Sequence, residues 1–253
     1  MKTDRVRRLF LTLLSGVTIF ALGQIYALAQ SSSSSPVCPR FPAGSVINQG
    51  PDLFSSNRVL RVNLNYQTTV DANGLTLFCY TTSDGKESPN LHVHPGDTII
   101  FTLTNTVPEP PAGQLVFTPE RAAKDKYLRM SAPKALDMIK EMNMTQSAST
   151  QCGDAMQDAT STNVHYHGTN TSPTCHSDEV IHTLINSGTT FRYNLFIPFN
   201  EPSGLYWYHP HVHGLAEVAV QGGASAGLIV EGIGKVNPDT EGLPERVLMI
   251  RDN

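Results

Sequence analysis

Short apolar segments separated by turn residues follow one another along most of the chain. In residues 58–70, RVLRVNLNYQTTV, apolar side chains alternate with polar ones, which is the two-residue period of a half-buried strand. Segments rich in β-branched or aromatic residues predict further strands at 75–82, 98–106, 163–168, 190–199, 204–214, 226–232 and 245–250. Turn sequences such as DANG, TSDG, HPGD and EPSG separate them. Many short strands with turns between them predict an all-β sandwich or barrel.

One long segment does not fit this strand pattern. Residues 107–160 contain RAAKDKYLRMSAPKALDMIKEMNM, which is rich in helix formers, followed by a polar run. We predict a partly helical insertion at about 107–160 in a loop of the β fold. The segment holds five of the seven methionines, whose thioethers are soft ligands for Cu(I). The i, i+4 spacing of Met138 and Met142 favours packing in a short helix over such a role.

The first residues have the features of an export signal. A basic start, MKTDRVRR, is followed by a mostly apolar run that ends in Ala27-Leu28-Ala29, an A-x-A cleavage pattern. We predict a signal peptide over residues 1–29 and a flexible Ser-rich start over 30–37; an uncleaved membrane anchor is the alternative. Arg7-Arg8 resembles a twin-arginine signal, although Val6 stands where Ser or Thr is usual. The sequence therefore predicts an exported protein, periplasmic or extracellular, that is free of the membrane after cleavage.

Charge and cysteine content narrow the class of partner. The formal net charge is −4 and no basic run lies outside the first ten residues, so nucleic acid is not an expected partner. Four cysteines form an even set, which in an oxidising compartment predicts two disulfides with three possible connectivities. We favour Cys38–Cys79 with Cys152–Cys175, because the second pair would tie the insertion to the fold. No pair has the C-x-x-C spacing of zinc or thioredoxin-like sites.

Two strand-like segments each carry an H-x-H motif. They are His165-Tyr166-His167 and His209-Pro210-His211, the second continuing to His213. Residues i and i+2 of a strand point to one face, about 6.6–7 Å apart, so two such pairs on neighbouring strands would gather four imidazoles. Imidazole is a good ligand for copper, zinc and iron. Tyr166 and Tyr208 would point the other way and pack behind the histidines.

Other features of the histidine pattern are less specific. Pro210 cannot donate to a β-ladder, which predicts an edge or an irregularity in its strand. His92-Val93-His94 is also an H-x-H, but it stands directly before the turn Pro95-Gly96-Asp97. We interpret four histidines as ordinary surface or packing residues: His92, His94, His176 and His182.

The motifs do not fit the commoner zinc or cupin patterns. Zinc hydrolases usually combine His with a nearby Asp or Glu, as in H-E-x-x-H, and no such motif occurs here. A cupin also uses H-x-H on a β-barrel, and His211, His213 and Glu217 fit its first motif. Its second motif requires a later histidine, and none follows His213.

Longer stretches around these histidines resemble one family. NVHYHGTNTSP, DEVIHTLINSGTTFRYNLFIP, PSGLYWYHPHVHG and GGASAGLIVEG are similar to the first cupredoxin (plastocyanin-like) domain of bacterial laccase-like multicopper oxidases. SPNLHVHPGDTIIFTLTN resembles an earlier strand of that domain, where a P-G-D turn precedes a strand ending in Asn. The resemblance covers about residues 38–253 and implies a Greek-key cupredoxin β-sandwich.

The resemblance also implies a set of copper ligands. In this family four H-x-H motifs hold a trinuclear copper cluster, which reduces O2 to water with electrons from phenols, metal ions or similar one-electron donors. Carried over to this chain, His165 would bind the type 2 copper, and His167, His209 and His211 would bind the type 3 pair. Asp178 would be the acidic residue that hydrogen-bonds copper-bound water and helps proton delivery.

The third histidine of the second motif has no such assignment. His213 is not a ligand in the family pattern. We expect its alternation with His209 and His211 to be a property of one strand, with at most a supporting contact to the site.

Half of the family's motifs are absent from this sequence. Type 1 copper requires H-C-H-x-x-x-H, but Cys175-His176 has no preceding His, and Val180 stands at the later His position. Two of the four cluster motifs are absent as well, and the sequence ends at ERVLMIRDN, where such enzymes continue into a second cupredoxin domain. We therefore expect the N-terminal part of an exported oxidase, not competent alone, whose remaining ligands come from C-terminal cupredoxin domains or a partner chain.

Two other functions remain open from the sequence. A non-enzymatic copper-binding cupredoxin domain for copper sequestration or delivery is the main alternative, and a cupin-like metalloenzyme is a weaker one.

Overall fold

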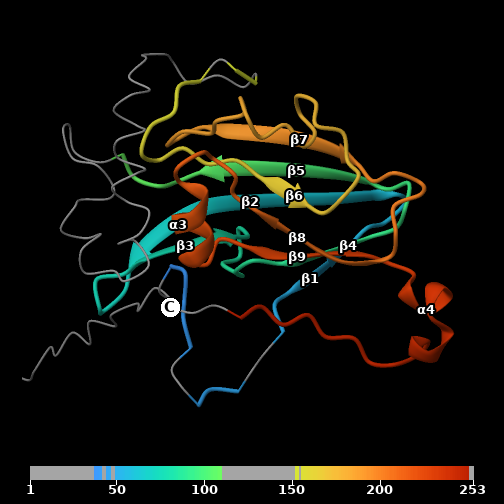
Figure 1. The fold of residues 1–253 in the computed structure, drawn as a ribbon. Helices are drawn as coiled ribbons and strands as arrows, with labels where there is room; N and C mark the ends of the chain where they lie inside the picture. Colours follow the sequence, from blue (N-terminus) through green and yellow to red (C-terminus); the bar gives the residue numbers. More distant parts are fainter. Residues whose placement is uncertain (1–36, 42–43, 47–48, 110–151, 154, 251–253) are drawn as a thin grey trace, which may run out of the picture. The chain divides into compact units, whose positions relative to one another are not determined.

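The strands form two β-sheets in the computed structural model, which describes residues 37–41, 44–46, 49–109, 152–153 and 155–250 (Figure 1). One sheet has the strand order β1-β4-β9-β8-β6 and the other has the order β3-β2-β5-β7. The predicted leader at 1–29, the Ser-rich start up to residue 36 and residues 110–151 of the predicted insertion lie outside the described residues.

The four-stranded sheet includes the segment in which apolar and polar residues alternate, residues 58–70. Its strands are β3 (Thr76–Thr81), β2 (Val59–Val70), β5 (Thr98–Asn105) and β7 (Thr190–Phe196). β2 pairs antiparallel with β3 and parallel with β5, and β7 pairs antiparallel with β5. In β7 every second side chain is buried and the rest are exposed, as expected when one face of a sheet packs on a core.

The five-stranded sheet carries both histidine motifs. Its strands are β1 (Asp52–Phe54), β4 (Asn90–Val93), β9 (Ala226–Val230), β8 (Gly204–His209) and β6 (His165–His167). β1, β4 and β9 are parallel to one another, whereas β8 is antiparallel to both β9 and β6. β6 is the last strand of this sheet, so the first histidine motif lies at the edge of the sheet as the structure describes it.

Aromatic side chains fill the space between the two sheets. Phe101 of β5 packs edge-on against Tyr166 of β6 and Tyr208 of β8, with ring centroids 6.1 Å and 5.8 Å apart. Tyr80 of β3 lies 5.5 Å from Tyr208, and all four rings are completely buried. Contacts of this kind join strands of opposite sheets, which confirms the predicted all-β sandwich.

Two very short strands were missing from the strand prediction. β1 and β4 have three and four residues, so they are too short to show an alternating pattern. The P-G-D turn before β5 and the Asn at its end were correctly placed.

The predicted strand at 245–250 is wrong. That segment is irregular, yet Val247 is buried, and its amide donates to Gln49 Oε1 at 3.3 Å. A Cβ atom at Gly227 would come within 3.0 Å of Val247 Cγ1. The side chain of Val247 therefore packs on the face of β9. This buries the apolar residue although the segment forms no β-ladder.

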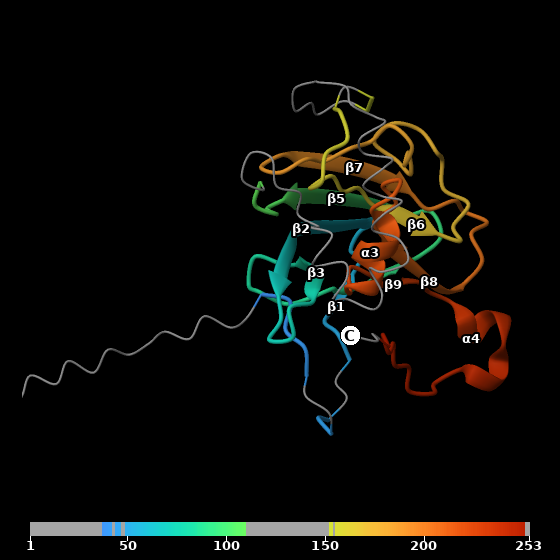
Figure 2. The same ribbon diagram turned by 60° about the vertical axis from the view of Figure 1, so that its left-hand side comes forward.

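Short helices lie between and after the last two strands in the described C-terminal part of the chain. They are α3 (Ala216–Gln221), α4 (Ile233–Val236) and the 3₁₀ helix η1 (Pro238–Thr240). The end of α3 lies against β3, where the Phe78 amide donates to the Gly222 carbonyl at 2.8 Å (Figure 2). The helical character predicted for 107–160 falls on residues outside the described part, and the described residues 155–160 contain no helix. Among the residues whose placement is described, no helix has the length and apolar character needed to span a bilayer.

Both predicted disulfides form. Cys38 pairs with Cys79 and Cys152 with Cys175, with Cα atoms 5.4 Å and 5.7 Å apart. Cys38 and Cys79 are buried, whereas Cys175 is exposed in the loop that follows β6. The second bond ties the end of the 107–160 segment to that loop.

The difference in burial predicts an order of reduction. Because thiol–disulfide exchange requires access to a sulfur atom, a dithiol reductant should open Cys152–Cys175 well before Cys38–Cys79 in the folded protein. Alkylation followed by peptide mapping at timed intervals measures both bonds. Simultaneous reduction, or peptides that join Cys38 to Cys152 or Cys175, would contradict the described pairing.

Candidate metal centre

The pairing of β6 with β8 makes the two histidine motifs neighbours. The register places His165 opposite His209 and Tyr166 opposite Tyr208. The ring centroid of His165 lies 5.4 Å from that of His209 and 5.4 Å from that of His167. The two-residue period of the strands thus puts the imidazoles on one face and the tyrosines on the other, as the sequence predicted.

The chain leaves the sheet directly after His209. β8 ends at that residue, and Pro210, which has no N–H to donate, follows it. The predicted irregularity at Pro210 is therefore present. The His211 ring still joins the cluster, with its centroid 5.0 Å from that of His165 and 6.1 Å from that of His209.

The expectation for His213 was wrong. It does not continue a strand, because the strand has ended four residues earlier, and it lies exposed in the turn before α3. Its carbonyl accepts a hydrogen bond from Gln157 Nε2 at 2.8 Å. The alternation of His209, His211 and His213 is thus not a property of one strand. His213 contacts Gln157 through its backbone carbonyl.

The cluster offers ligand nitrogens in a small volume. One ring nitrogen from each of His165, His167 and His209 lies within 4.8 Å of the other two. His209 is buried, His165 is half-buried, and both His167 and His211 are exposed. The four rings therefore form a site that is closed on the side of the sheet and open toward the surface.

Asp178 fixes the orientation of His165. Its Oδ1 lies 3.0 Å from His165 Nδ1 and also accepts from the Tyr166 amide at 3.0 Å. With Nδ1 donating to the carboxylate, Nε2 of His165 carries the free lone pair. Asp178 is buried, and its Oδ2 accepts from the Thr171 hydroxyl at 3.4 Å. The predicted site acid thus contacts a predicted ligand directly, which is the arrangement that orients metal-binding histidines.

His209 is held in one tautomer in the same way. Its Nδ1 lies 2.8 Å from the Pro210 carbonyl, so Nδ1 donates and Nε2 has the free lone pair. Nε2 lies 3.4 Å from Nδ1 of His167. Burial lowers the pKa of His209 to about 4; the Pro210 carbonyl acts in the opposite direction, and the nearby His165, His167 and His211 lower it further. The ring is therefore neutral at pH 7 and available to a metal ion.

Aromatic rings restrict the motion of the cluster from two sides. Trp207, the chain's only tryptophan, stacks on His209 with centroids 3.9 Å apart and lies 5.2 Å from the ring of His167. On the opposite face Tyr166 and Tyr208 are fully buried with centroids 6.5 Å apart.

Sequence reasoning missed three polar or aromatic contributors to the site. Trp207 lies within the stretch PSGLYWYHPHVHG, but only the structure shows that it stacks on His209. Glu201 is buried and accepts from the Asn170 backbone amide at 2.9 Å and from its side-chain nitrogen at 3.2 Å, which joins the turn after β6 to the loop before β8. Asn163 donates to or accepts from three backbone groups around the cluster. The roles of Glu201 and Asn163 could not be predicted from the sequence, because most of their contacts join residues far apart in the chain.

The other H-x-H does not join the cluster. Across the sheet His92 is level with Ile229, and Ile229 is level with Leu205, four residues before His209. At ~3.3 Å per residue, four residues place His92 roughly 13 Å along the sheet from His209, in addition to the spacing of two strands.

The remaining histidines have local partners, as their interpretation as ordinary residues requires. His92 lies between two carboxylates, with Nδ1 2.7 Å from Glu231 Oε1 and Nε2 3.3 Å from Asp52 Oδ1. The other three contact Asp97 Oδ2 at 3.6 Å (His94), the Arg192 carbonyl at 2.8 Å (His176) and Glu179 Oε1 at 3.1 Å (His182).

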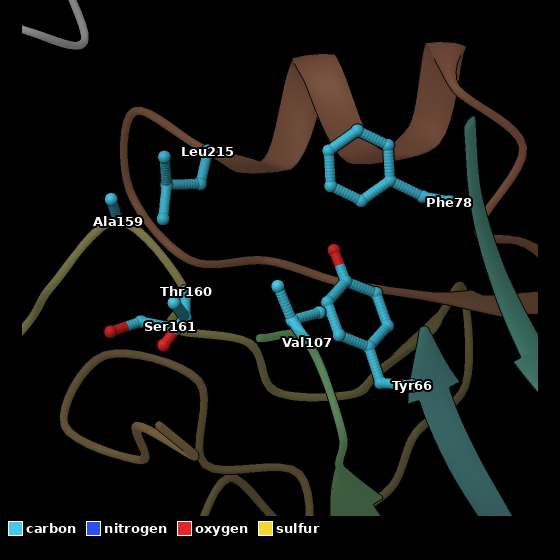
Figure 3. Close-up of a pocket in the computed structure, with 7 residues that line it drawn as sticks. All are labelled: Tyr66, Phe78, Val107, Ala159, Thr160, Ser161 and Leu215. Atoms are coloured by element: carbon cyan, nitrogen blue, oxygen red, sulfur yellow. The ribbon is translucent and has the colours of Figure 1, made fainter. Parts of the chain in front are cut away.

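A pocket elsewhere in the fold is unrelated to the cluster. It lies between α3 and the ends of β2 and β5, and Figure 3 shows the Tyr66 hydroxyl directed into it near Phe78 and Leu215. The residues that line it are Tyr66, Phe78, Val107, Ala159, Thr160, Ser161 and Leu215. None is a histidine, and burial raises the pKa of the Tyr66 hydroxyl. The pocket therefore offers no metal ligands.

Comparison with protein families supports the chemistry that the cluster suggests. Residues 155–232 match a family model described as "Multicopper oxidase". The matched segment contains all four clustered histidines and Asp178. Residues 155–232 are thus similar to multicopper oxidases. Homology to this family implies copper binding, and imidazole nitrogens such as those gathered here are good copper ligands. A comparison with curated proteins found no match.

Several solved structures of multicopper oxidases are similar to the chain. McoA from the hyperthermophile Aquifex aeolicus has 16% identity and a TM-score of 0.46, over 78% of this chain and 32% of that one. A multicopper oxidase from Campylobacter jejuni, described as a metallo-oxidase, has 18% identity and a TM-score of 0.44, over 76% and 30%. The laccase-like CueO from Ochrobactrum sp. has 17% identity and a TM-score of 0.45, over 79% and 32%. The chain thus spans about a third of the length of these proteins.

The lowered pKa of His209 predicts how the stability of the metal-free protein depends on pH. In the unfolded chain this ring takes up a proton near its ordinary pKa of 6.5, whereas in the folded protein it does so only near 4. The unfolded state therefore binds more protons in this interval, so the free energy of unfolding should fall as the pH falls from about 6.5 to about 4. Above pH 6.5 this contribution is complete and constant.

Chemical denaturation at a series of pH values, in the presence of a chelator, measures this dependence. His209→Asn keeps a donor for the Pro210 carbonyl but cannot titrate, and it should flatten the curve in this interval relative to the wild type. An unchanged slope in the variant would show that His209 is not the group responsible.

Proposed function

We propose that this chain is the N-terminal part of an exported multicopper oxidase and supplies half of the protein ligands of its trinuclear copper cluster. Residues 38–253 form the cupredoxin-like domain in this proposal. His165 binds the type 2 copper, and His167, His209 and His211 bind the type 3 pair. The observation that supports this most directly is that His165, His167 and His209 converge from β6 and β8, with His211 beside them, within the segment that matches the multicopper oxidase model.

The donor set fits copper. The cluster presents imidazole nitrogens, and the adjacent acid Asp178 is hydrogen-bonded to His165 and to the Tyr166 amide. Imidazole ligands suit copper, whereas magnesium and calcium prefer oxygen ligands. Copper, when bound, supplies the one-electron chemistry that couples oxidation of phenols or metal ions to the reduction of O2 to water.

Around that metal, the chain's own residues act by positioning and by holding protons. Asp178 keeps the Nε2 lone pair of His165 directed at the site, and the Pro210 carbonyl does the same for His209. Trp207 covers one face of the His209 ring. As a buried carboxylate beside a ligand, Asp178 is also placed to accept a proton and pass it to the site, which is the catalytic role that we assign to it.

The open side of the cluster fits a shared site. Affinity in metal sites follows the number and geometry of ligands, and His167 and His211 are exposed here. In this proposal further cupredoxin domains, or a partner chain, cover that side and supply the remaining ligands. The cysteines cannot provide a type 1 copper site, because all four are in disulfides.

Export is the remaining part of the proposal. The sequence begins with a basic segment, an apolar run and an A-x-A site. Two disulfides are typical of proteins from oxidising compartments such as the periplasm or the cell exterior.

One alternative is also compatible with the observations. A non-enzymatic copper-binding domain for sequestration or delivery would use the same four histidines and would need no type 1 site. The open side of the cluster favours it, because exposed ligands exchange metal readily. The genomic sequence downstream of the codon for Asn253 separates the two functions. A reading frame that continues into an H-C-H-x-x-x-H motif favours the oxidase, and a stop codon there favours the copper-binding domain.

The stacking of Trp207 on His209 gives a direct measure of metal binding. Cu(II) bound at this cluster should quench the emission of the only tryptophan in a saturable way, whereas Zn(II) should not. His209→Ala with His211→Ala should remove most of the high-affinity quenching, because two of the four rings are lost. The matched control is His92→Ala with His94→Ala, which removes the H-x-H pair that lies outside the cluster and should leave the titration unchanged.

The same samples test the incompleteness of the site. The copper-loaded chain should show no intense blue absorption, because no thiolate is available, and it should not oxidise a phenolic dye. Blue protein with oxygen uptake would contradict the proposal that this chain holds half of the ligands. Quenching that survives the loss of His209 and His211 would place the metal elsewhere.

A second prediction concerns the acid. Asp178→Asn removes the charge that orients His165 but keeps the shape, so the affinity for Cu(II) should fall by roughly 10–100-fold. Asp97→Asn is the matched control, because Asp97 is also buried and accepts from the Ser55 hydroxyl at 2.6 Å and the His94 amide at 2.8 Å, away from the cluster. Equal losses in the two variants would mean that Asp178 has only a structural role.

A further inference from the structure

Asn163 is a buried polar residue that lies outside both H-x-H pairs. It lies two residues before His165, just outside β6, and it has no exposed surface. Its side chain makes three hydrogen bonds, all to backbone groups. A buried amide is costly to desolvate unless its donors and acceptor are paired, so these bonds determine where it can be tolerated.

The three partners belong to two segments beside the cluster, the second histidine motif and the loop that carries Asp178. Asn163 Oδ1 accepts from the His211 amide at 2.7 Å. Asn163 Nδ2 donates to the Val180 carbonyl at 3.1 Å and to the Thr183 carbonyl at 3.1 Å. The second and third partners lie in the loop that begins with Asp178, so one side chain connects β6, the second histidine motif and the loop that carries the acid.

The bond to His211 occurs where the sheet no longer fixes the chain. β8 ends at His209 and Pro210 has no N–H, so the β-ladder does not extend to His211. The His211 side chain is exposed, yet its ring lies 5.0 Å from that of His165. The backbone contact with Asn163 is therefore the fixed point from which His211 reaches the cluster.

The two bonds from Asn163 Nδ2 reach a turn that the Glu179 carboxylate holds together. Glu179 accepts from the amides of Ile181, His182 and Thr183 and from the Thr183 hydroxyl. Burial raises the pKa of Glu179, but these hydrogen bonds outweigh it and lower the pKa overall. The turn is thus a stable unit, and Asn163 attaches it to β6 at both of its ends.

We propose that Asn163 is a positioning residue for the metal centre, which sets His211 and the Asp178 loop relative to His165. This inference rests on the proposed function, because it concerns the site that binds copper there. Only an amide of this length supplies one acceptor and two donors in this arrangement; Asp lacks the donors, and Ser has a single hydroxyl.

The chain contains a matched control for this role. Asn105 is also completely buried, at the end of β5. It donates to the Thr160 carbonyl at 2.7 Å and the Ile185 carbonyl at 2.8 Å, and it accepts from the Val107 amide at 3.0 Å. Its hydrogen bonds have the same pattern as those of Asn163, but none of them reaches a histidine of the cluster or the Asp178 turn.

The first measurement uses the metal-free protein. The His211 amide should exchange slowly with solvent in the wild type, although the residue is exposed and outside a strand. Exchange should become much faster in Asn163→Ser and stay slow in Asn105→Ser. Asn163→Asp keeps an acceptor oxygen, so its His211 amide should remain protected. A His211 amide that exchanges as fast as that of His213 in the wild type would overturn the inference without any variant.

The second measurement is Cu(II) affinity from Trp207 quenching, together with the electron paramagnetic resonance spectrum of bound Cu(II). Asn163→Ser should weaken binding by roughly 10–100-fold and change the nitrogen hyperfine pattern, as expected when a contact that orients ligands is lost. Asn105→Ser should lose comparable stability and keep both the affinity and the spectrum. Equal effects of the two variants on affinity, or wild-type binding in Asn163→Ser, would overturn the inference.

Failure of the proposed function gives a different result. If the wild type does not bind Cu(II), or binds it equally well without His209 and His211, the metal assignment is wrong. The exchange of the His211 amide would still report whether Asn163 fixes that residue.

Discussion

The antiparallel register of β6 and β8 is the constraint on which the rest of the site depends. It places His165 opposite His209 and, one residue further, Tyr166 opposite Tyr208. A shift by one residue would send every side chain of β6 to the other face, so the histidines would enter the core and the tyrosine would face solvent. The core makes that shift unfavourable, because Phe101 packs edge-on against both tyrosines and all three rings are fully buried. The apolar core behind the sheet therefore determines which imidazoles meet on its outer surface.

Most of this could be predicted from the sequence, because it depends on local periods. Alternation predicted β2, β-branched and aromatic residues predicted β5 and β7, and the two H-x-H motifs predicted the face that carries the ligands. The errors occurred where tertiary contacts override local pattern. Val247 lies in an apolar segment that packs on Gly227 without joining a sheet, and His213 extends an alternation that Pro210 has already ended. The short strands β1 and β4 form through pairing with each other and with β9.

The polar contacts that hold the ligands could not be predicted in this way. Asp178 was found through its place in a family pattern, but its two contacts, His165 Nδ1 and the Tyr166 amide, are properties of the folded loop. Most hydrogen bonds of the Glu201 and Asn163 side chains join them to groups that are 20 or more residues away in sequence. Nothing in their local sequence separates them from the asparagines and glutamates of ordinary turns. Such residues become visible only when the burial of each polar atom is compared with its partners.

The distribution of burial among the four rings has a consequence for the chemistry. His209, the most buried, is kept neutral by its environment and stacked under Trp207, so it can bind a metal at neutral pH with little rearrangement. His167 and His211 lie on the open side, where water competes for any metal they bind. A site that activates oxygen works in a volume from which bulk water is excluded, since reactive species are otherwise lost to side reactions. The open side must therefore be covered before such chemistry is possible. One docking event in the proposed function would thus complete the ligand set and exclude water together.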